Sequence, residues 1–289
     1  MLRELDIIII NYNSTDLLLI CLESIYKNYN KDNICIWVWD NNSNDNPGRI
    51  RARFPHVYLN ENNRNIGFAA AVNRGLEWSR APYVMLLNPD TEIKKKVIDV
   101  LLIQMKCQKN LGVLGPKILN PDGSLQQSAR AFPNLFTGIY GRTSILTKIF
   151  PKNRMTQKNL LATSVNGKTP IEVDWISGAC MLVRKEAIQN VGFLDERFYM
   201  YWEDADWCRR MREKGWRVVY NPVISVLHSV GKSSQSHPIR SSLEFHKSAY
   251  FLYAKYAAGK QLLLLPIVFG ALIFRFYILS TYTILKRFF

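Results

Sequence analysis

Short apolar runs alternate along the first 115 residues with segments in which apolar residues recur at helical spacing. Uninterrupted apolar runs are typical of strands buried on both faces, and their alternation with helical patterns predicts βαβ units in a mainly parallel, doubly wound sheet. The expected strands are 5–10, 34–39, 57–59 and 83–87, and the expected helices are 17–26, 68–79 and 94–108. The fold class expected from this pattern is α/β.

A second structured block follows a basic connection at 134–168, which is rich in Ser, Thr and Asn and only weakly periodic. Further strands are expected from about Val113, over 171–175 and 177–183, and over 218–220 and 223–227. A helix is expected from Glu203, because acids fill its first turn and arginines follow, an order that favours the helix dipole.

The strand expected at 83–87 ends on Asn88-Pro89-Asp90. Open α/β sheets bind their ligands at the carboxyl ends of strands, and a divalent cation prefers oxygen ligands such as these. An ordinary turn leaving a strand has the same composition, so the tripeptide alone does not decide between the two interpretations.

Three further loops at the same expected edge, 11–16, 40–45 and 60–67, are rich in Asn, Asp and Ser. They favour a nucleotide-binding crevice, although such residues are also what loops commonly contain. The helix after Gly67 carries neither Gly-x-Gly-x-x-Gly nor a Walker lysine, which disfavours a dinucleotide fold and a P-loop. Its amino end, preceded by Arg64 and Asn65, can still hold an anion.

Aromatic residues at 198–202 lead directly onto Glu203 and Asp204. Aromatic faces beside carboxylates can hold a sugar, and desolvation tunes a carboxylate for proton abstraction. Adjacent residues on a helix are about 100° apart, so one acid would do the chemistry and the other would orient it. His228 ends an expected strand before a Gly/Ser/Lys loop, which makes it either a metal or phosphate ligand or a structural histidine.

The segment 262–285 is almost wholly apolar except for Arg275. Its length suffices for a membrane span, but a central charge is costly, so an in-plane helix is a rival and a buried core helix a third possibility. The preceding basic residues suit the anionic cytoplasmic leaflet. They are Lys232, Arg240, Lys247, Lys255 and Lys260, against the single acid Glu244.

The 289-residue chain has a formal net charge of +15, which points to anionic partners such as nucleotide diphosphates, nucleic acid or an anionic membrane. Its five cysteines are odd in number and form no Cys-x-x-Cys pair, which fits a reducing cytosolic compartment. No signal-peptide pattern opens the sequence, so export is not expected.

Over about residues 6–234 the chain resembles the inverting family 2 glycosyltransferases of the GT-A fold, and within them the rhamnosyltransferase-like branch. The motifs that carry the resemblance occur in the family's order. They are Ile9-Ile10-Asn11-Tyr12-Asn13, Asp40-Asn41-Asn42-Ser43, the run from Asn65 to Gly75, Leu87-Asn88-Pro89-Asp90, Ser177-Gly178-Ala179, Trp202-Glu203-Asp204 and His228.

The resemblance implies a role for each matching position. Asp204 would be the general base, with Glu203 beside it, and Asp90 and His228 would hold a divalent metal, Mg²⁺ or Mn²⁺. The nucleotide-sugar site would comprise Asn11, Asn13, Asp40, Asn65, Gly67, Asn73 and Asn88. The acceptor site would comprise Trp175, Gly178 and Trp202.

The family's Asp-x-Asp signature is altered here, because Asn88 replaces its first acid and so lowers the charge at the metal site. The same Asn-Pro-Asp is frequent in the rhamnosyltransferase-like branch, which favours dTDP-L-rhamnose as donor. A basic, membrane-attached enzyme suggests a saccharide or lipid-linked saccharide acceptor at the inner leaflet, in cell-surface polysaccharide synthesis.

The expected organisation is a GT-A catalytic domain over 1–235, with a nucleotide-sugar half to about 115 and an acceptor half beyond it, followed by a membrane-associating tail over 236–289. One rival is a nucleotidyltransferase, disfavoured because the loop after Ile10 lacks a Gly-rich start. A non-enzymatic basic protein that binds membrane or nucleic acid is another, and it leaves the acids at strand ends unexplained. Nucleic acid is not an expected partner.

Overall fold

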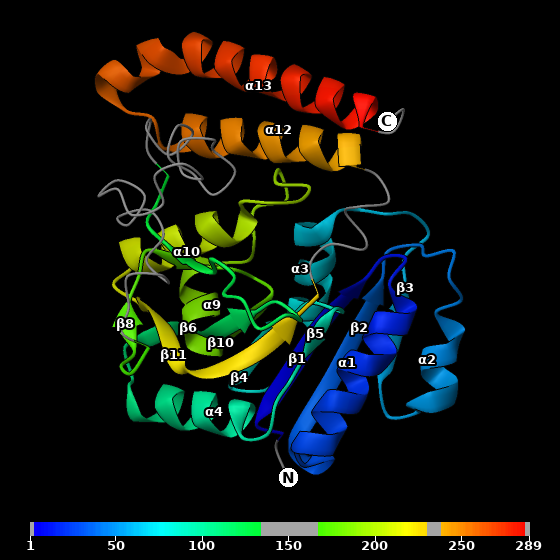
Figure 1. Cartoon of the computed structure of the whole chain (residues 1–289). Helices are drawn as coiled ribbons and strands as arrows, with labels where there is room; N and C mark the ends of the chain where they lie inside the picture. The colour runs from blue at the N-terminus through cyan, green and yellow to red at the C-terminus, as the bar shows by residue number, and fades with distance from the viewer. Residues whose placement is uncertain (1–2, 134–166, 230–237, 287–289) are drawn as a thin grey trace.

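The computed structural model describes residues 3–133, 167–229 and 238–286. Nine strands in this part of the chain form one sheet in the order β3-β2-β1-β4-β10-β6-β11-β5, with β8 paired to β11 (Figure 1). The expected connection at 134–168 lies almost entirely outside the described residues.

Four parallel strands make the first half of the sheet, namely β1 (Leu5–Asn11), β2 (Ile34–Asp40), β3 (Tyr58–Glu61) and β4 (Tyr83–Leu87). In the second half β6 (Leu111–Leu119) and β11 (Arg217–His228) are parallel, while β10 (Cys180–Arg184) is antiparallel to both β4 and β6. Two short strands, β5 (Thr91–Glu92) and β8 (Ile171–Glu172), are antiparallel to β11.

The sheet is buried on both faces, as the apolar runs predict. Along β1, Ile7 and Ile9 belong to one buried cluster and Ile8 and Ile10 to the other, because successive side chains of a strand point to opposite faces. The first cluster is covered by α1 (Thr15–Asn28), α2 (Gly48–Arg53) and α4 (Val97–Cys107). The second is covered by α3 (Phe68–Trp78), α9 (Lys185–Val191) and α10 (Glu203–Glu213).

The strands expected in the first 115 residues are confirmed, as are the helices expected at 17–26, 68–79, 94–108 and from Glu203. The expected division near residue 115 falls inside β6, so the two halves belong to one continuous sheet. The short helices α2 and α9 were not expected.

Two strand predictions were wrong in detail. The segments 218–220 and 223–227 form the single strand β11, whose pairing with β6 is irregular between Asn221 and Ser225. Pro222, which lacks a backbone N–H, lies in this irregularity, so the ladder is interrupted while the strand continues. The segment 171–175 divides into β8 and β9 (Trp175–Ile176), and β9 pairs with β7 (Ala129–Arg130) in a separate two-stranded sheet.

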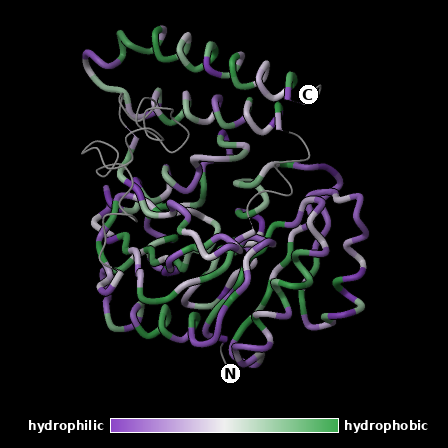
Figure 2. The backbone as a smooth tube through the Cα atoms, viewed as in Figure 1, coloured by the Kyte–Doolittle hydropathy of each residue, from purple (hydrophilic) through white to green (hydrophobic). Residues whose placement is uncertain are grey.

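The C-terminal region is a helical hairpin. The long helix α12 (Pro238–Tyr256) is followed by the 3-10 turn η2 (Gly259–Leu264) and by α13 (Leu265–Leu285), which packs along α12. In Figure 1 the two helices lie across the top of the molecule with α13 outermost, and Figure 2 shows α13 as hydrophobic along most of its length.

The possibility of a buried core helix is excluded for this segment, because only Ser280 of α13 is buried. Among the described residues, Gly259–Leu285 is the single helical stretch long and apolar enough to cross a membrane. By length and composition, the expectation of a membrane-associating tail therefore remains open.

Candidate active site

The register of the sheet brings the polar strand ends together at one edge. Asn11 is paired with Asp40 on β2, and Ile9, two residues earlier, is paired with Leu87 on β4. Cys180, the first residue of β10, is also paired with Leu87. The segments that follow β1, β2 and β4 and the segment that precedes β10 therefore share the edge at which open α/β sheets bind ligands.

Asn11 and Asp40 form the buried centre of the first part of this edge. Asn11 Nδ2 donates to Asp40 Oδ1 at 2.7 Å, and the backbone N–H of Ser43 donates to Asp40 Oδ2 at 2.8 Å. Asn11 Oδ1 is buried and has no hydrogen-bond partner among the described residues. An orphaned buried acceptor is costly, so it marks a position at which a ligand donor can bind.

Asn13 lies in the same cluster but takes part chiefly through its backbone. Its N–H donates to Ser43 Oγ at 2.9 Å, and its side-chain oxygen accepts from the N–H of Asn44 at 2.8 Å. Its φ of 51° places it in the left-handed region, which Asn tolerates better than most residues. The residue therefore shapes the loop beside Asp40.

Asn65 and Gly67 join this edge to the aromatic segment at 198–202. Asn65 Oδ1 accepts from the Tyr199 hydroxyl at 2.9 Å, and Phe68 N donates to the Tyr199 carbonyl at 2.7 Å. Gly67 has a φ of 91°, and a Cβ there would lie 2.7 Å from that carbonyl oxygen. Only glycine fits this close approach.

Asn73 differs from the other residues expected at the donor site. Its Nδ2 donates to the Leu194 carbonyl and to Glu196 Oε1, both at 2.9 Å, and its Oδ1 accepts from the Leu194 N–H at 3.0 Å. Both amide hydrogens are used within the protein. These contacts favour a structural role, in which Asn73 ties α3 to the 194–196 segment.

Asn88, Asp90 and His228, which the resemblance places at the metal and donor sites, lie side by side. His228 Nε2 lies 3.0 Å from Asp90 Oδ1 and 3.1 Å from Asn88 Nδ2, and all three side chains are at most partly exposed. The N–H of Ser229 donates to the Asp90 carbonyl at 2.9 Å and fixes the end of β11 beside the loop after β4. Within the described residues, no cluster of three or more His, Cys, Asp or Glu side chains is placed to hold a metal.

Gln126, which the sequence analysis missed, orients His228. The Gln126 amide donates to the His228 carbonyl at 2.6 Å and to Asn120 Oδ1 at 2.8 Å, so its Oε1 faces His228 Nδ1 at 2.9 Å. Nδ1 can donate to this oxygen, and Nε2 lies between the Asn88 amide and the Asp90 carboxylate. An imidazole that ligates a metal is commonly held in this way through its other nitrogen.

Glu203 and Asp204 begin α10 in different surroundings. Asp204 accepts from the N–H of Gly178 at 3.0 Å and from that of Ala205 at 2.8 Å, whereas Glu203 Oε2 is buried without a partner among the described residues. Burial, reinforced by the charge of Asp204, raises the pKa of Glu203 well above its ordinary value. Burial also raises the pKa of Asp204, although the two N–H donors and nearby Arg130 oppose this rise.

The segment 177–179 connects the acid pair to the metal site. The Gly178 N–H binds Asp204 on one side, while the Ala179 carbonyl accepts from the Asn88 N–H at 3.0 Å and from the Thr91 hydroxyl at 3.2 Å on the other. Adjacent Cα atoms are about 3.8 Å apart, so this segment brings the two groups into one site.

The two tryptophans expected to bind an acceptor are unequal. The rings of Trp175 and Trp202 lie 5.8 Å apart, but Trp175 is only 6% exposed and its Nε1 donates to the Ala131 carbonyl. The Arg130 guanidinium lies 5.0 Å from the Trp175 ring centre and close to Asp204. Trp175 therefore contacts both Arg130 and Trp202, and the sequence did not indicate the proximity of Arg130 to Asp204.

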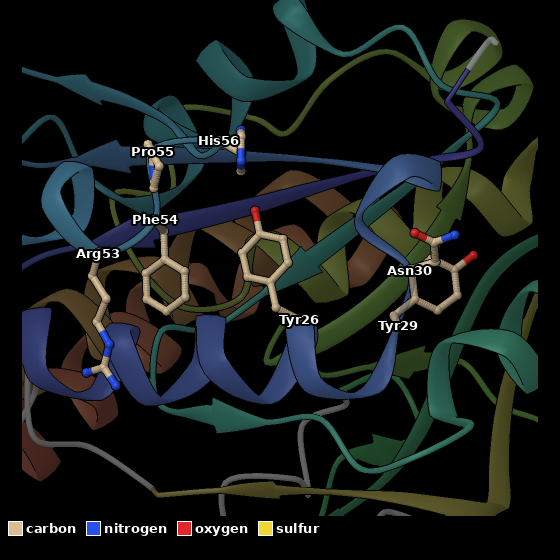
Figure 3. A pocket seen from close by; sticks show the side chains of 7 residues that line it. All are labelled: Tyr26, Tyr29, Asn30, Arg53, Phe54, Pro55 and His56. Carbon is tan, nitrogen blue, oxygen red and sulfur yellow. The ribbon is translucent and has the colours of Figure 1, made fainter.

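Figure 3 shows a hollow that is separate from this site. It is lined by the end of α1, which precedes β2, and by the end of α2 and the segment after it, which precede β3. The hollow is therefore at the amino ends of the strands, on the opposite edge of the sheet. Its lining residues are Tyr26, Tyr29, Asn30, Arg53, Phe54, Pro55 and His56.

Comparison with known proteins identifies the family of the chain. The profile of the family described as glycosyl transferase family 2 matches residues 6–192. The chain is 34% identical over 239 residues to the N-acetylglucosaminyl-diphospho-decaprenol L-rhamnosyltransferase of Mycobacterium tuberculosis, covering 78% of this chain and 76% of that protein. It is 28% identical over 211 residues to the rhamnosyltransferase WbbL of Escherichia coli, with coverage of 72% and 73%.

Among solved structures, the mannosyltransferase PcManGT of Pyrobaculum calidifontis, in complex with GDP-Man and Mn²⁺, is similar with a TM-score of 0.57 at 16% identity. The similarity covers 93% of this chain and 68% of that one. The sheet and the polar edge thus define a glycosyltransferase of the GT-A fold. The chain belongs to glycosyl transferase family 2.

Proposed function

We propose that the protein transfers L-rhamnose from dTDP-L-rhamnose, with inversion, to a hydroxyl of a saccharide or lipid-linked saccharide in cell-surface polysaccharide synthesis. Both relatives described above carry rhamnosyltransferase names, and one of them acts on a diphospho-decaprenol. Family membership favours sugar transfer over the nucleotidyltransferase alternative, and pyrophosphate release in place of nucleoside diphosphate release would revive that alternative.

The donor would bind along the edge formed by β1, β2 and β4. The unpaired Asn11 Oδ1 and the adjacent Asp40 are proposed to hold the nucleoside, and Asn65 and Gly67 to line the pocket at the amino end of α3. A helix amino end offers unpaired N–H groups and partial positive charge to an anion such as a diphosphate.

The residues present fit a divalent cation, Mg²⁺ or Mn²⁺, that is shared with the donor diphosphate. Asp90 Oδ1 and His228 Nε2 lie 3.0 Å apart and would be its protein ligands, while Asn88 Nδ2 lies 3.1 Å from Nε2. Such cations are often held by one or two protein ligands together with substrate phosphates, which suits so small a donor set. When bound, the cation neutralises charge on the departing diphosphate.

Asp204 is the proposed general base. It would take the proton from the acceptor hydroxyl while that oxygen attacks the anomeric carbon and the nucleoside diphosphate leaves from the opposite side. The two acids differ in their surroundings: burial and the charge of Asp204 raise the pKa of Glu203 well above its ordinary value, while two N–H donors favour the carboxylate form of Asp204. Glu203 would then be the supporting member of the pair.

The observation that carries the proposal is the placement of Asp204 and of Asn88–Asp90 on the two sides of segment 177–179. The test measures nucleoside diphosphate release by the full chain from a panel of dTDP-, UDP- and GDP-sugars, with Mn²⁺ or with chelator. Release only from dTDP-L-rhamnose, only with metal and acceptor, and with a product of inverted anomeric configuration is expected. Turnover of another donor would refute rhamnose as the transferred sugar but not sugar transfer itself. No turnover of any donor would refute the whole proposal.

Attachment to the cytoplasmic side of the cell membrane completes the proposal, with the anionic membrane surface as a partner. A lipid-linked acceptor is confined to the bilayer, so an enzyme that uses it gains from residence there. The apolar stretch Gly259–Leu285 and the basic charge of the chain support this location.

A further inference from the structure

The outward face of α13 consists of uncharged, mostly apolar side chains. Residues at helical spacing along this face, among them Ile267, Phe274 and Ile278, are each more than half exposed. Between Lys260 and Lys286 the single charged residue is Arg275. Soluble proteins rarely expose a continuous apolar face of this length, so a partner covers it.

Arg275 belongs to the opposite face of α13. Its Nη1 lies 3.0 Å from His246 Nε2 on α12, and its guanidinium is 5.8 Å from the Phe245 ring centre. His246 Nδ1 donates to the Ser242 carbonyl at 2.6 Å, so Nε2 is free to accept from Arg275. The Arg275 charge, which argues against a membrane span, therefore contacts α12 within the hairpin.

The hairpin is also tied to the catalytic domain through α12. Lys255 Nζ lies 2.6 Å from Asp206 Oδ1 and 2.8 Å from Asp195 Oδ2, and the Tyr256 hydroxyl donates to Asp206 at 2.8 Å. Asp206, on α10, is fully buried. Lys255 was expected to face an anionic membrane, but it forms an internal ion pair instead.

We propose that α13 lies in the plane of an anionic lipid bilayer, with its outward face at the boundary of headgroups and acyl chains and with α12 between it and the catalytic domain. Basic residues at both ends support this orientation, since Lys260 precedes α13 and Lys286-Arg287 follows it. A spanning helix would move one basic end to the far side, against the positive-inside bias, and would take Arg275 into the hydrocarbon away from His246.

This orientation turns the catalytic segment toward the bilayer. On α12, Ser248 Oγ donates to the Met200 carbonyl at 2.9 Å, and Phe245 contacts Trp202 with 5.5 Å between ring centres. Tyr201 and Trp202 have φ values of 71° and 70°, conformations that persist only when their surroundings hold them. Helix α12 therefore contacts both the catalytic segment 200–202 and the membrane-facing helix α13.

Cysteine accessibility tests the orientation directly. Cys107 on α4 is exposed, and the other four cysteines are buried, so Cys107 reports the side of the catalytic domain. A second protein carries Cys107→Ser and one cysteine appended after Phe289. Both are treated with an impermeant maleimide in inverted and in right-side-out membrane vesicles. Labelling of both cysteines in inverted vesicles alone is expected, whereas labelling of the two from opposite sides would overturn the in-plane orientation.

A matched pair of variants tests the surface itself. Ile267→Glu changes the outward face of α13, and Ile103→Glu changes an isoleucine of similar exposure on α4. Binding of the full chain to phosphatidylglycerol vesicles, measured by flotation, should weaken by about tenfold for Ile267→Glu and stay unchanged for Ile103→Glu. Equal binding by both variants would refute the proposal that the outward face of α13 contacts the bilayer. Neither assay involves turnover, so these outcomes are independent of the donor and acceptor proposed above.

Discussion

Two adjacent acids acquire different chemistry from their surroundings. Asp204 is held by the N–H groups of Gly178 and Ala205, which stabilise its carboxylate, whereas Glu203 Oε2 is buried with no such donor in the described structure. A base must be ionised before it accepts a proton, so the polar contacts select Asp204. Sequence spacing alone indicated only that the two acids cannot act on one atom together.

Replacement of Asp204 by Asn removes the proposed base and keeps an oxygen that can accept from the Gly178 N–H. Nucleoside diphosphate release with acceptor should fall by about 10²- to 10⁴-fold. Asp122→Asn, in an exposed turn, is the matched control and should leave the rate unchanged. Full turnover by Asp204→Asn would exclude it as the base.

The pH dependence follows from the direction of the Asp204 pKa shift. Burial raises this pKa, so the acid form persists to higher pH than for an exposed aspartate, and only the carboxylate can take the proton. kcat/KM should therefore rise with pH until the group is ionised and fall progressively below that pH. A rate that stays constant as the pH is lowered to 4 would contradict this assignment.

Gln126→Leu tests the orientation of His228. Leu removes the acceptor for His228 Nδ1, so the imidazole loses its fixed tautomer. Loss of such a supporting contact typically weakens metal binding by about 10- to 100-fold. The Mn²⁺ concentration for half-maximal activity should rise accordingly, with the maximal rate largely restored at saturating metal, whereas Gln189→Leu on the exposed side of α9 should change neither.

Sequence reasoning found the residues whose role is indicated by neighbouring positions in the chain. It missed those whose role depends on contacts with residues far away in the sequence. Asn88 and Asp90 follow a strong apolar run, so their place at a strand end is readable from neighbouring positions. Gln126 lies 102 positions from His228, and no local sequence pattern marks it. Its contact with His228 exists only in the folded protein. Lys255 was misread for the same reason, since its partner Asp206 belongs to another element.

At the scale of elements, the strands with unbroken apolar runs were predictable and the irregular ones were not. The strand β4 is buried along its whole length and matches its predicted range. The two strands expected at 218–220 and 223–227 are one strand, β11, because pairing with β6 continues on both sides of Pro222. Helix α12 was read as a basic stretch, because its packing partners lie in α10, α13 and the loop before α10.

The contact between α12 and α10 yields a stability prediction. Lys255→Met leaves the fully buried Asp206 without one of its cations and should destabilise the protein by about 2 kcal/mol. This is less than the full cost of breaking a buried pair, because Lys255 itself is partly exposed. Arg49→Met makes the same chemical change in an exposed pair with Asp16 and should cost less than about 1 kcal/mol. Thermal midpoints compare the two, and equal midpoints would show that the network contributes no stability.

At the scale of the whole molecule, the proposed donor site draws residues from both halves of the sheet. Asn11 and Asp40 come from the parallel strands β1 and β2, whereas His228 comes from the end of β11 on the far side of β10 and β6. The loop after β4 lies between them and contributes Asp90. A nucleotide diphosphate bound through a metal would contact both halves, while a nucleoside alone would contact only the first.

A ligand that binds only the folded state stabilises it by about 2.7 kcal/mol at a concentration 100 times its Kd. Saturating dTDP with Mn²⁺ should therefore raise the thermal midpoint of the full chain by about 5 °C or more. Asp90→Ala, or chelation of the metal, should remove most of this increase because the diphosphate loses its link to the second half, whereas Asp122→Ala should retain it. If chelation leaves the stabilisation by dTDP intact, nucleotide binding does not use the Asp90 and His228 pair, and the metal site fails while the nucleotide site stands.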